Sequence, residues 1–212
     1  MTREEFIEEL IKEGYSYEIE GDKIVVYEDG DVYLESLETL PPGVAEFKNT
    51  GDVYLNSLET PPPGVHFNNA GSVVLESLKT LPPGVVQFKN GGYVWLNSLK
   101  TLHPGVEFNN GGYVDLSSLK TLPPGVEFNN RGDVYLNSLE TPLPGVEFKN
   151  GGDAYFASLK TLPPGVQFNN RGLVYLEALI GGVGWFSQWS GNIEGIDSKT
   201  LLNGMIKRGI FI

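Results

Sequence analysis

One feature constrains this chain more than any other: a unit of about 20 residues that recurs eight times. The consensus unit reads GDVYLNSLKTLPPGVEFNNG, and successive units begin 20 or 21 residues apart. A period of this length is typical of proteins in which each unit forms one coil and buries its apolar side against the neighbouring coils. The eight units begin at Gly30, Gly51, Gly71, Gly92, Gly112, Gly132, Gly152 and Gly172.

The apolar residues of the unit predict two short strands per coil. Counted from the first glycine, apolar residues occupy positions 3 and 5, 8 and 11, and 15 and 17, for example Val53, Leu55, Leu99, Leu102, Val126 and Phe128. Positions 3/5 and 15/17 alternate with polar residues, which indicates strands with one buried face. Gly at position 1, with access to positive φ, and Pro-Pro-Gly at positions 12–14 predict two corners. We therefore predict a β-rich solenoid of stacked coils with short parallel strands over residues 30–180, about 35–40 Å long.

The two ends of the chain depart from the repeat, and we expect them to cap the solenoid with helices within one cooperative domain. Residues 1–29 begin with a capping-box pattern, Thr2 with Glu5, and the predicted helix ends at Gly14. Residues 181–212 combine aromatic residues with a second predicted helix. The apolar tail over 210–212 is expected to pack on this cap, and the alternative is a docking or homodimer contact.

Part of the unit carries a resemblance to a known family. The stretch Leu78-Lys79-Thr80-Leu81-Pro82-Pro83-Gly84-Val85 resembles the L-x-x-L-P-x-x-L half of short bacterial leucine-rich repeats. With its F-N-N-G-G and V-x-L-x-S-L stretches, the whole unit is similar to leucine-rich-repeat-like proteins of bacteria and their phages. The resemblance covers about residues 30–180 and implies a solenoid, but it implies no particular activity. A glycine stands where the usual repeat has a leucine, which leaves hand and curvature open.

Composition excludes several classes of function. The chain has 15 Lys and Arg against 27 Asp and Glu, a net charge of -12, which argues against a nucleic-acid binder. It has no Cys, and its two histidines, His66 and His103, lie at different unit positions, so we expect no enzyme activity, metal site or cofactor. No run of 18 apolar residues is present, and we expect a cytoplasmic protein that does not bind membranes.

An aromatic column at position 4 is the candidate binding site. It should point outward, between polar residues at positions 2 and 6, and it is interrupted at Val74 and Asp115. Cross-strand stacking is an ordinary structural role for such residues, but a flat sheet with aromatic anchors also suits a contact face. The column consists of Tyr33, Tyr54, Trp95, Tyr135, Tyr155 and Tyr175.

The main hypothesis is therefore a non-catalytic protein-binding module that uses this face. The alternatives are a carbohydrate-binding face, a purely structural scaffold, and an acidic mimic of DNA that inhibits a DNA-binding enzyme. Residues 30–180 carry 15 acidic and 9 basic residues, a net charge of -6. A DNA duplex of the solenoid's length would carry about twenty charges, so the solenoid carries too little negative charge to imitate DNA closely.

A second column, of Asn at position 19, should point inward, because alternation from positions 15 and 17 carries it to the buried side. Buried amides need hydrogen-bond partners, and the nearby glycine corner offers backbone groups. We predict that these amides satisfy the corner. The residues are Asn49, Asn69, Asn90, Asn110, Asn130, Asn150 and Asn170.

Overall fold

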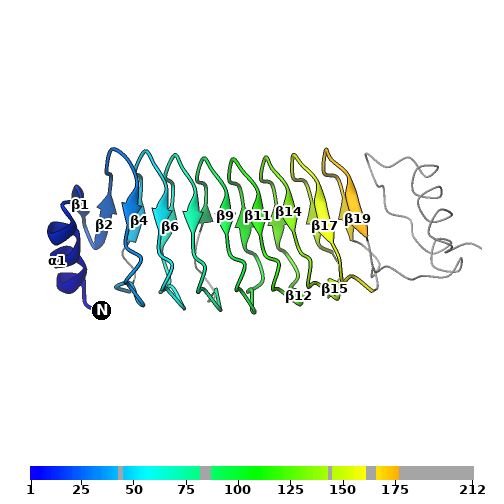
Figure 1. Cartoon of the computed structure of the whole chain (residues 1–212), viewed down its shortest axis with the longest axis horizontal. Coiled ribbons are helices and arrows are strands. Elements are labelled where there is room, and N and C mark those ends of the chain that lie inside the picture. Colours follow the sequence, from blue (N-terminus) through cyan, green and yellow to red (C-terminus); the bar gives the residue numbers. More distant parts are fainter. Residues whose placement is uncertain (43–44, 82–86, 143–144, 161–165, 177–212) are drawn as a thin grey trace, which may run out of the picture.

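The chain forms a β-solenoid whose coils are stacked along one axis (Figure 1). The structure, a computed structural model, describes residues 1–42, 45–81, 87–142, 145–160 and 166–176. Each coil advances by one repeat unit, so that equivalent positions of neighbouring units pair in parallel, as Val114 pairs with Val134. The predicted fold class is confirmed for the repeat region. The predicted C-terminal cap and the tail over 210–212 lie outside the described residues.

Two long sheets run along the solenoid, and we call them sheet 1 and sheet 2. Sheet 1 contains the strands at unit positions 3–4, all parallel. They are β3 (Val32–Tyr33), β5 (Val53–Tyr54), β7 (Val73–Val74), β9 (Val94–Trp95), β11 (Val114–Asp115), β14 (Val134–Tyr135), β17 (Ala154–Phe156) and β19 (Val174–Leu176).

Sheet 2 contains the strands that end at unit position 17, and two N-terminal strands extend it. The repeat strands are β4 (Ala45–Phe47), β6 (His66–Phe67), β8 (Gln87–Phe88), β10 (Glu107–Phe108), β13 (Glu127–Phe128), β16 (Glu147–Phe148) and β18 (Gln167–Phe168). A small third sheet, which the sequence pattern did not predict, pairs β12 (Thr121–Leu122) with β15 (Thr141–Pro142).

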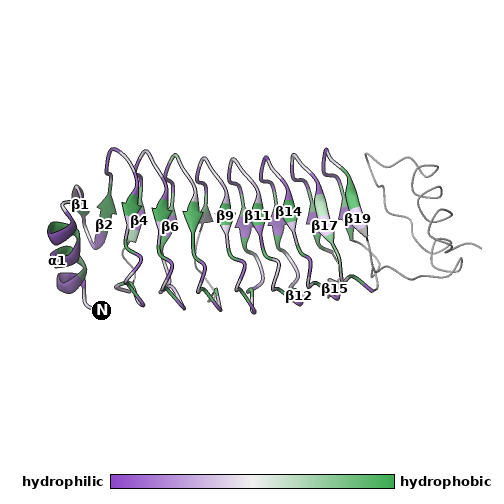
Figure 2. Ribbon diagram, in the orientation of Figure 1, coloured by the Kyte–Doolittle hydropathy of each residue, from purple (hydrophilic) through white to green (hydrophobic). Residues whose placement is uncertain are grey.

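The core lies between the sheets and is built from the predicted inward positions (Figure 2). The clearest column is the phenylalanine at position 17, whose members are all 0% exposed. Neighbouring rings stack, for example Phe108 on Phe128 with centroids 5.3 Å apart and planes 6° apart. A lone coil could not bury such a ring on both faces, so this column makes the stability of each coil depend on its neighbours.

The glycine corner at position 1 differs from the prediction. Among the described glycines, position 1 has positive φ only in the first unit, at Gly30; otherwise positive φ in the repeat occurs at the last residue of the Pro-Pro-Gly corner, as at Gly105 (φ 78°). Position 1 needs glycine because the coils approach closely. A Cβ on Gly112 would lie 2.7 Å from the backbone nitrogen of Tyr93 in the preceding coil. The residue is thus selected by contact between coils rather than by its own φ.

The N-terminal residues form the predicted cap. Helix α1 (Arg3–Glu13) begins with the Thr2/Glu5 capping box and ends at Gly14 in the left-handed conformation. Its Phe6 side chain is 0% exposed and belongs to the core cluster. Strand β1 (Tyr17–Glu20) pairs antiparallel with β2 (Lys23–Val26), which in turn pairs in parallel with β4 of the first coil. Within the described ranges, no helix has both the length and the apolar character needed to cross a membrane.

Candidate functional site

The six aromatic residues predicted as a site all lie on sheet 1, but they do not form one uninterrupted stack. Tyr33 stacks on Tyr54 with ring centroids 4.9 Å apart. Beyond Tyr54, the buried Val74 stands in register before Trp95. Asp115 separates Trp95 from the next group in the same way. That group is Tyr135, Tyr155 and Tyr175, whose centroids are 4.8 Å and 4.7 Å apart in turn.

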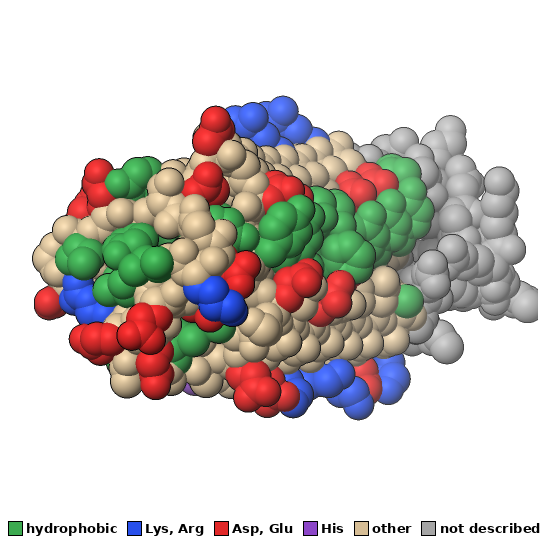
Figure 3. Space-filling view, turned by 60° about the vertical axis from the view of Figure 1, so that its left-hand side comes forward, with side chains coloured by type: hydrophobic (Ala, Val, Ile, Leu, Met, Phe, Trp, Pro, Cys, Tyr) green, Lys and Arg blue, Asp and Glu red, His purple; other side chains and the backbone are tan. Residues whose placement is uncertain are grey.

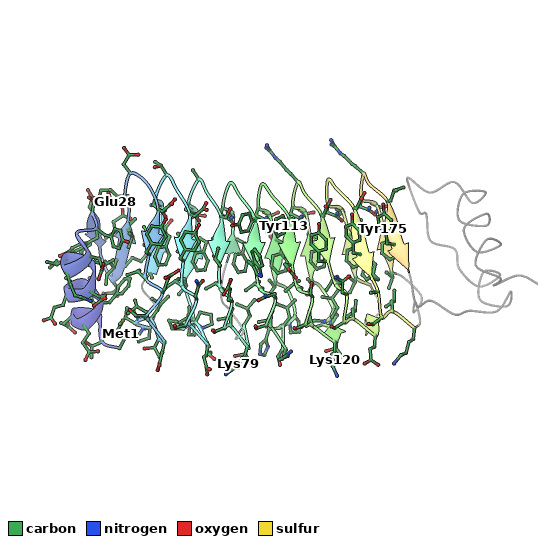
Figure 4. The ribbon with its side chains drawn as sticks, viewed as in Figure 1. Met1, Glu28, Lys79, Tyr113, Lys120 and Tyr175 are labelled. Atoms are coloured by element: carbon green, nitrogen blue, oxygen red, sulfur yellow. The ribbon has the colours of Figure 1, made fainter. Side chains whose placement is uncertain are left out.

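Two tyrosines at position 2, which the sequence analysis did not include, join these groups. Tyr93 and Tyr113 stack on each other with centroids 4.8 Å apart. Tyr93 meets Trp95 edge to face at 6.1 Å, and Tyr113 meets Tyr135 at 5.8 Å in the same manner. The result is a continuous aromatic run of six rings, Trp95, Tyr93, Tyr113, Tyr135, Tyr155 and Tyr175. Figure 4 labels two of them, Tyr113 and Tyr175. The signal in the sequence was Tyr in place of Asp at position 2, in two adjacent units.

Four of the position 4 tyrosines are held by an aspartate at position 2 of their own coil. The Tyr54 hydroxyl donates to Asp52 Oδ2 at 3.1 Å, and Asp52 Oδ1 accepts from the backbone N–H of Ser72 in the next coil at 2.6 Å. Each such aspartate ties two coils together and orients one ring. The same arrangement occurs at Tyr33 with Asp31, Tyr135 with Asp133, and Tyr155 with Asp153.

These contacts change the acidity of the tyrosines. Burial, followed by the hydrogen bond to Asp52, raises the pKa of Tyr54 to about 12. Burial and Asp153 raise the pKa of Tyr155 to about 12 in the same way. A neutral phenol donates to a carboxylate, whereas a phenolate would be repelled by it, so both rings stay protonated at physiological pH. The aromatic face is therefore rigid and neutral at its rings, with the negative charge confined to the aspartates.

The fifth coil reverses this arrangement. Its residues read Tyr113-Val114-Asp115, where three other coils read Asp-Val-Tyr and a fourth reads Asp-Ala-Tyr. Asp115 Oδ1 accepts hydrogen bonds from the backbone N–H of Ser117, at 2.9 Å, and from the Ser117 hydroxyl. In the described part of the chain, Asp115 Oδ2 has no hydrogen-bond partner. The neighbouring Trp95 Nε1 is buried and also lacks one there.

The outward positions of sheet 1 carry negative charge and no positive charge in the described units. Lys and Arg are absent from positions 2, 4 and 6 of these units. Figure 3 shows hydrophobic side chains gathered in a stripe along the solenoid, with acidic side chains beside it. The acidic residues at these positions are Asp31, Glu35, Asp52, Glu76, Asp115, Asp133 and Asp153.

Sheet 2 has a different character, because two of its outward carboxylates, those of Glu46 and Glu147, are paired with lysines. Lys149 lies 2.9 Å from Glu147, and Lys48 lies 3.5 Å from Glu46. Glu46 is only 8% exposed, but the amide of Asn68 and the nearby lysines lower its pKa in spite of the burial. These carboxylates are already neutralised, which makes this face a weaker candidate for binding.

The two histidines do not form a site. His66 lies in β6 of sheet 2, where burial and then the charge of Lys23 lower its pKa. His103 lies two coils further on, at a Pro-Pro-Gly corner, and two coils span about 9.6 Å. No cluster of three or more His, Cys, Asp or Glu that could hold a metal ion occurs among the residues that the structure describes.

Comparisons of the chain with protein-family models, with curated proteins and with solved structures found no match. What the aromatic face can do therefore follows from its own residues. It offers a row of ordered, half-buried rings and a row of carboxylates that no Lys or Arg at positions 2, 4 and 6 of the described units neutralises. Such a surface offers both apolar and acidic contacts to another molecule.

Proposed function

We propose that the outer face of sheet 1 binds a protein partner without catalysing a reaction. The observation that carries this proposal is the aromatic run, in which six rings touch in sequence and each remains partly exposed. Tyr and Trp are the residues that contribute most to protein interfaces. Rings already fixed by stacking lose little conformational freedom on binding, which leaves more of the contact energy for affinity.

The ring geometry favours a protein over a carbohydrate. Sugars bind aromatic side chains by lying against the ring faces. Here Tyr155 is stacked between Tyr135 and Tyr175, with planes within 7° of each neighbour, so both of its faces are covered. What such rings present to solvent is their edges, against which the side chains of a protein can pack.

The charges of the face fit a DNA mimic poorly. The eight units carry eight acidic residues at these positions, the seven above and Glu177, whereas a duplex of about 35 Å carries about twenty phosphate charges. Four of the seven, such as Asp133, are also engaged with a tyrosine hydroxyl and a backbone N–H. A purely structural role remains the alternative that the experiment below has to separate from binding, because stacking alone would stabilise the sheet.

We also propose kinship with the leucine-rich-repeat-like proteins of bacteria and phages, and with it a cytoplasmic location. The L-x-x-L-P stretch supports this kinship. The presence of two long parallel sheets, rather than one, sets this chain apart from the usual repeat of that family.

Affinity capture with matched variants tests the proposed binding face. Native protein would be compared with Ala157→Arg, which places a bulky cation at the half-exposed position 6 beside the run, and with the triple variant Tyr54→Ser, Tyr135→Ser and Tyr155→Ser. The control is Asn109→Arg on sheet 2, at a position where other coils carry Lys.

The expected result is a protein captured from bacterial lysate by native and control baits and lost with the other two. The purified partner should then bind Ala157→Arg at least tenfold more weakly than it binds native protein. Equal capture by all four baits, with each variant shown to be folded by circular dichroism, would contradict the proposal. The aromatic run would then have a structural role only.

A further inference from the structure

The fifth coil differs from the others at position 4 of the aromatic face. At position 4 the eight units carry six aromatic residues, one Val and one Asp, and the Asp is Asp115. A reversal of Asp and Tyr does not improve the stack, because it removes one ring from the column and gives up the Tyr-to-Asp hydrogen bond of the other coils. Asp115 instead bonds to Ser117, which stands where the two adjacent coils have Asn.

Aromatic rings surround the Asp115 carboxylate. In the sheet register it lies between Trp95 on one side and Tyr135 on the other, one coil away from each. Tyr113 precedes it by two residues on the same face and contacts Tyr135. The aspartate side chain is shorter than the rings on both sides, so the carboxylate stands at a lower level than the rest of the run.

Trp95 differs from the other rings of the column. Among the described residues it is the one position 4 ring without a parallel-stacked neighbour, since its contact with Tyr93 has planes 67° apart. Asp115, rather than another ring, is its partner in the next coil. One side of the indole is thus free of a stacked ring and adjoins a carboxylate.

The charge of the site is also left unbalanced. The other four aspartates of the face, such as Asp52, direct Oδ2 to a tyrosine hydroxyl. Asp115 Oδ2 has no such donor in the part of the chain that the structure describes, and positions 2, 4 and 6 of the described units offer no Lys or Arg. A carboxylate among aromatic rings on a face without cations attracts a cation from outside.

We propose that Asp115, Trp95 and Tyr113 form the recognition site for an arginine side chain of the protein partner. This inference rests on the proposed function and adds the chemistry of the partner. A guanidinium can hydrogen-bond to the carboxylate and lie over the indole at the same time, and Trp is the best cation–π acceptor. Lysine fits the charge but lacks the planar group, so arginine is preferred over lysine.

The test is an NMR titration of the full ¹⁵N-labelled chain with short blocked peptides. The probes are acetyl-Gly-Arg-Gly-amide, the Lys peptide of the same design, and the neutral Gln peptide as the control ligand. The readout is the Trp95 indole N–H signal, which is assigned from its loss in Trp95→Phe. We expect a saturable shift with the Arg peptide, a weaker response to Lys and none to Gln.

Three variants make the result specific. Asp115→Asn keeps the shape and the acceptor for Ser117 and should weaken the Arg peptide at least fivefold. Asp115→Tyr restores the residue that position 4 usually carries, should fold with a continuous column, and should abolish the response. Glu35→Gln removes one charge from the same face, three coils from Trp95, and should leave the affinity within twofold of native.

Failure of this inference is distinguishable from failure of the proposed function. An unchanged Trp95 signal with the Arg peptide, an equal response to Gln, or an equal loss in Glu35→Gln would overturn the arginine site. Loss of partner capture in Ala157→Arg would still support the binding face in each of those cases. A saturable Arg response in a chain whose capture is equal for all baits would support the site and reject the wider protein-binding face.

Discussion

The buried asparagine at position 19 shows how a single residue type closes the same corner in seven coils. Asn110 is 1% exposed, and its Nδ2 lies 3.0–3.1 Å from the carbonyl oxygens of Gly92, Gly112 and Tyr113. The predicted role of this column is confirmed. A flipped amide would set oxygen against three carbonyl oxygens, so the side chain has one orientation and Oδ1 faces away from the corner.

Replacement of Asn110 by Ala should therefore destabilise the protein by about 2–3 kcal/mol, because buried carbonyls lose their donor. The free energy of unfolding in urea measures this. The adjacent exposed Asn109 supplies the control, since Asn109→Ala should change stability by less than about 0.5 kcal/mol. Equal effects of the two substitutions would show that burial of the amide contributes nothing.

The glycine at position 1 leads to a second prediction at this scale. Ala at Gly112 would place Cβ 2.7 Å from Tyr93 N and 2.8 Å from Gly92 C, both backbone atoms that cannot move aside singly. We expect Gly112→Ala to lower the melting temperature by about 6–12 °C, since each kcal/mol lost shifts a domain of this size by about 2–4 °C and the loss is ~3 kcal/mol. Gly145→Ala has no atom within 4 Å of its Cβ and only backbone strain at φ 82°, so it should cost less. A larger loss at Gly145 would contradict the role assigned to close approach.

At the scale of the strand, sheet 1 combines stacking with an acid–phenol pair, and this combination makes its stability depend on pH. Tyr54 and Tyr155 have pKa values of about 12 in the folded chain, against about 10 for a free tyrosine. The folded state thus holds these protons more tightly than the unfolded state. Their stabilising contribution is complete below pH 10 and is lost as the pH rises to 12.

The melting temperature should accordingly fall between pH 10 and pH 12, and absorbance at 295 nm should show tyrosines that ionise in the same interval. In the double variant Tyr54→Phe, Tyr155→Phe the fall should be smaller, because two of the responsible protons are gone. A decline that began below pH 9, or one unchanged in the double variant, would assign the effect to other groups.

The sequence pattern predicted the strands of both long sheets but only part of the aromatic run. Alternation at positions 3/5 and 15/17 placed both strands, because a period of two leaves one choice of buried face. The aromatic run needed more, since Tyr93 and Tyr113 lie at a position that is Asp in four other units. Tyr93 contacts Trp95 within one coil, and Tyr113 contacts Tyr135 of the next coil. A consensus of the single unit does not represent such contacts between position 2 and position 4. The sequence also did not reveal why position 1 needs glycine, because the reason is a close contact with the preceding coil.

Successive coils of the solenoid pair in the same register, so we can test whether each coil is a unit of stability. Deletion of residues 132–151 removes one complete unit and joins Arg131 to Gly152, the first glycine of the next coil. We expect the shortened chain to fold cooperatively, with a lower melting temperature, because nearest-neighbour contacts are restored across the junction.

Deletion of residues 132–141, half a unit, supplies the comparison. It joins Arg131, at the end of one unit, to the Pro142-Leu143-Pro144-Gly145 stretch in the middle of the next, and it puts the phenylalanine column out of register. This chain should therefore lose its cooperative transition by circular dichroism. If both deletions behaved alike, the coils would not be the units of stability.

The direction of the sheet hydrogen bonds has a mechanical consequence. They run from coil to coil, as from the Asn129 N–H to the Phe108 carbonyl at 2.9 Å, and so lie along the long axis. A tension applied between the two ends therefore pulls along these hydrogen bonds, and we expect the contacts between coils to break one coil at a time. Each coil that yields releases twenty residues, about 65–70 Å of extended chain. Under such tension the repeat should yield in evenly spaced steps, and the eight coils should lengthen more than tenfold before the covalent backbone bears the load.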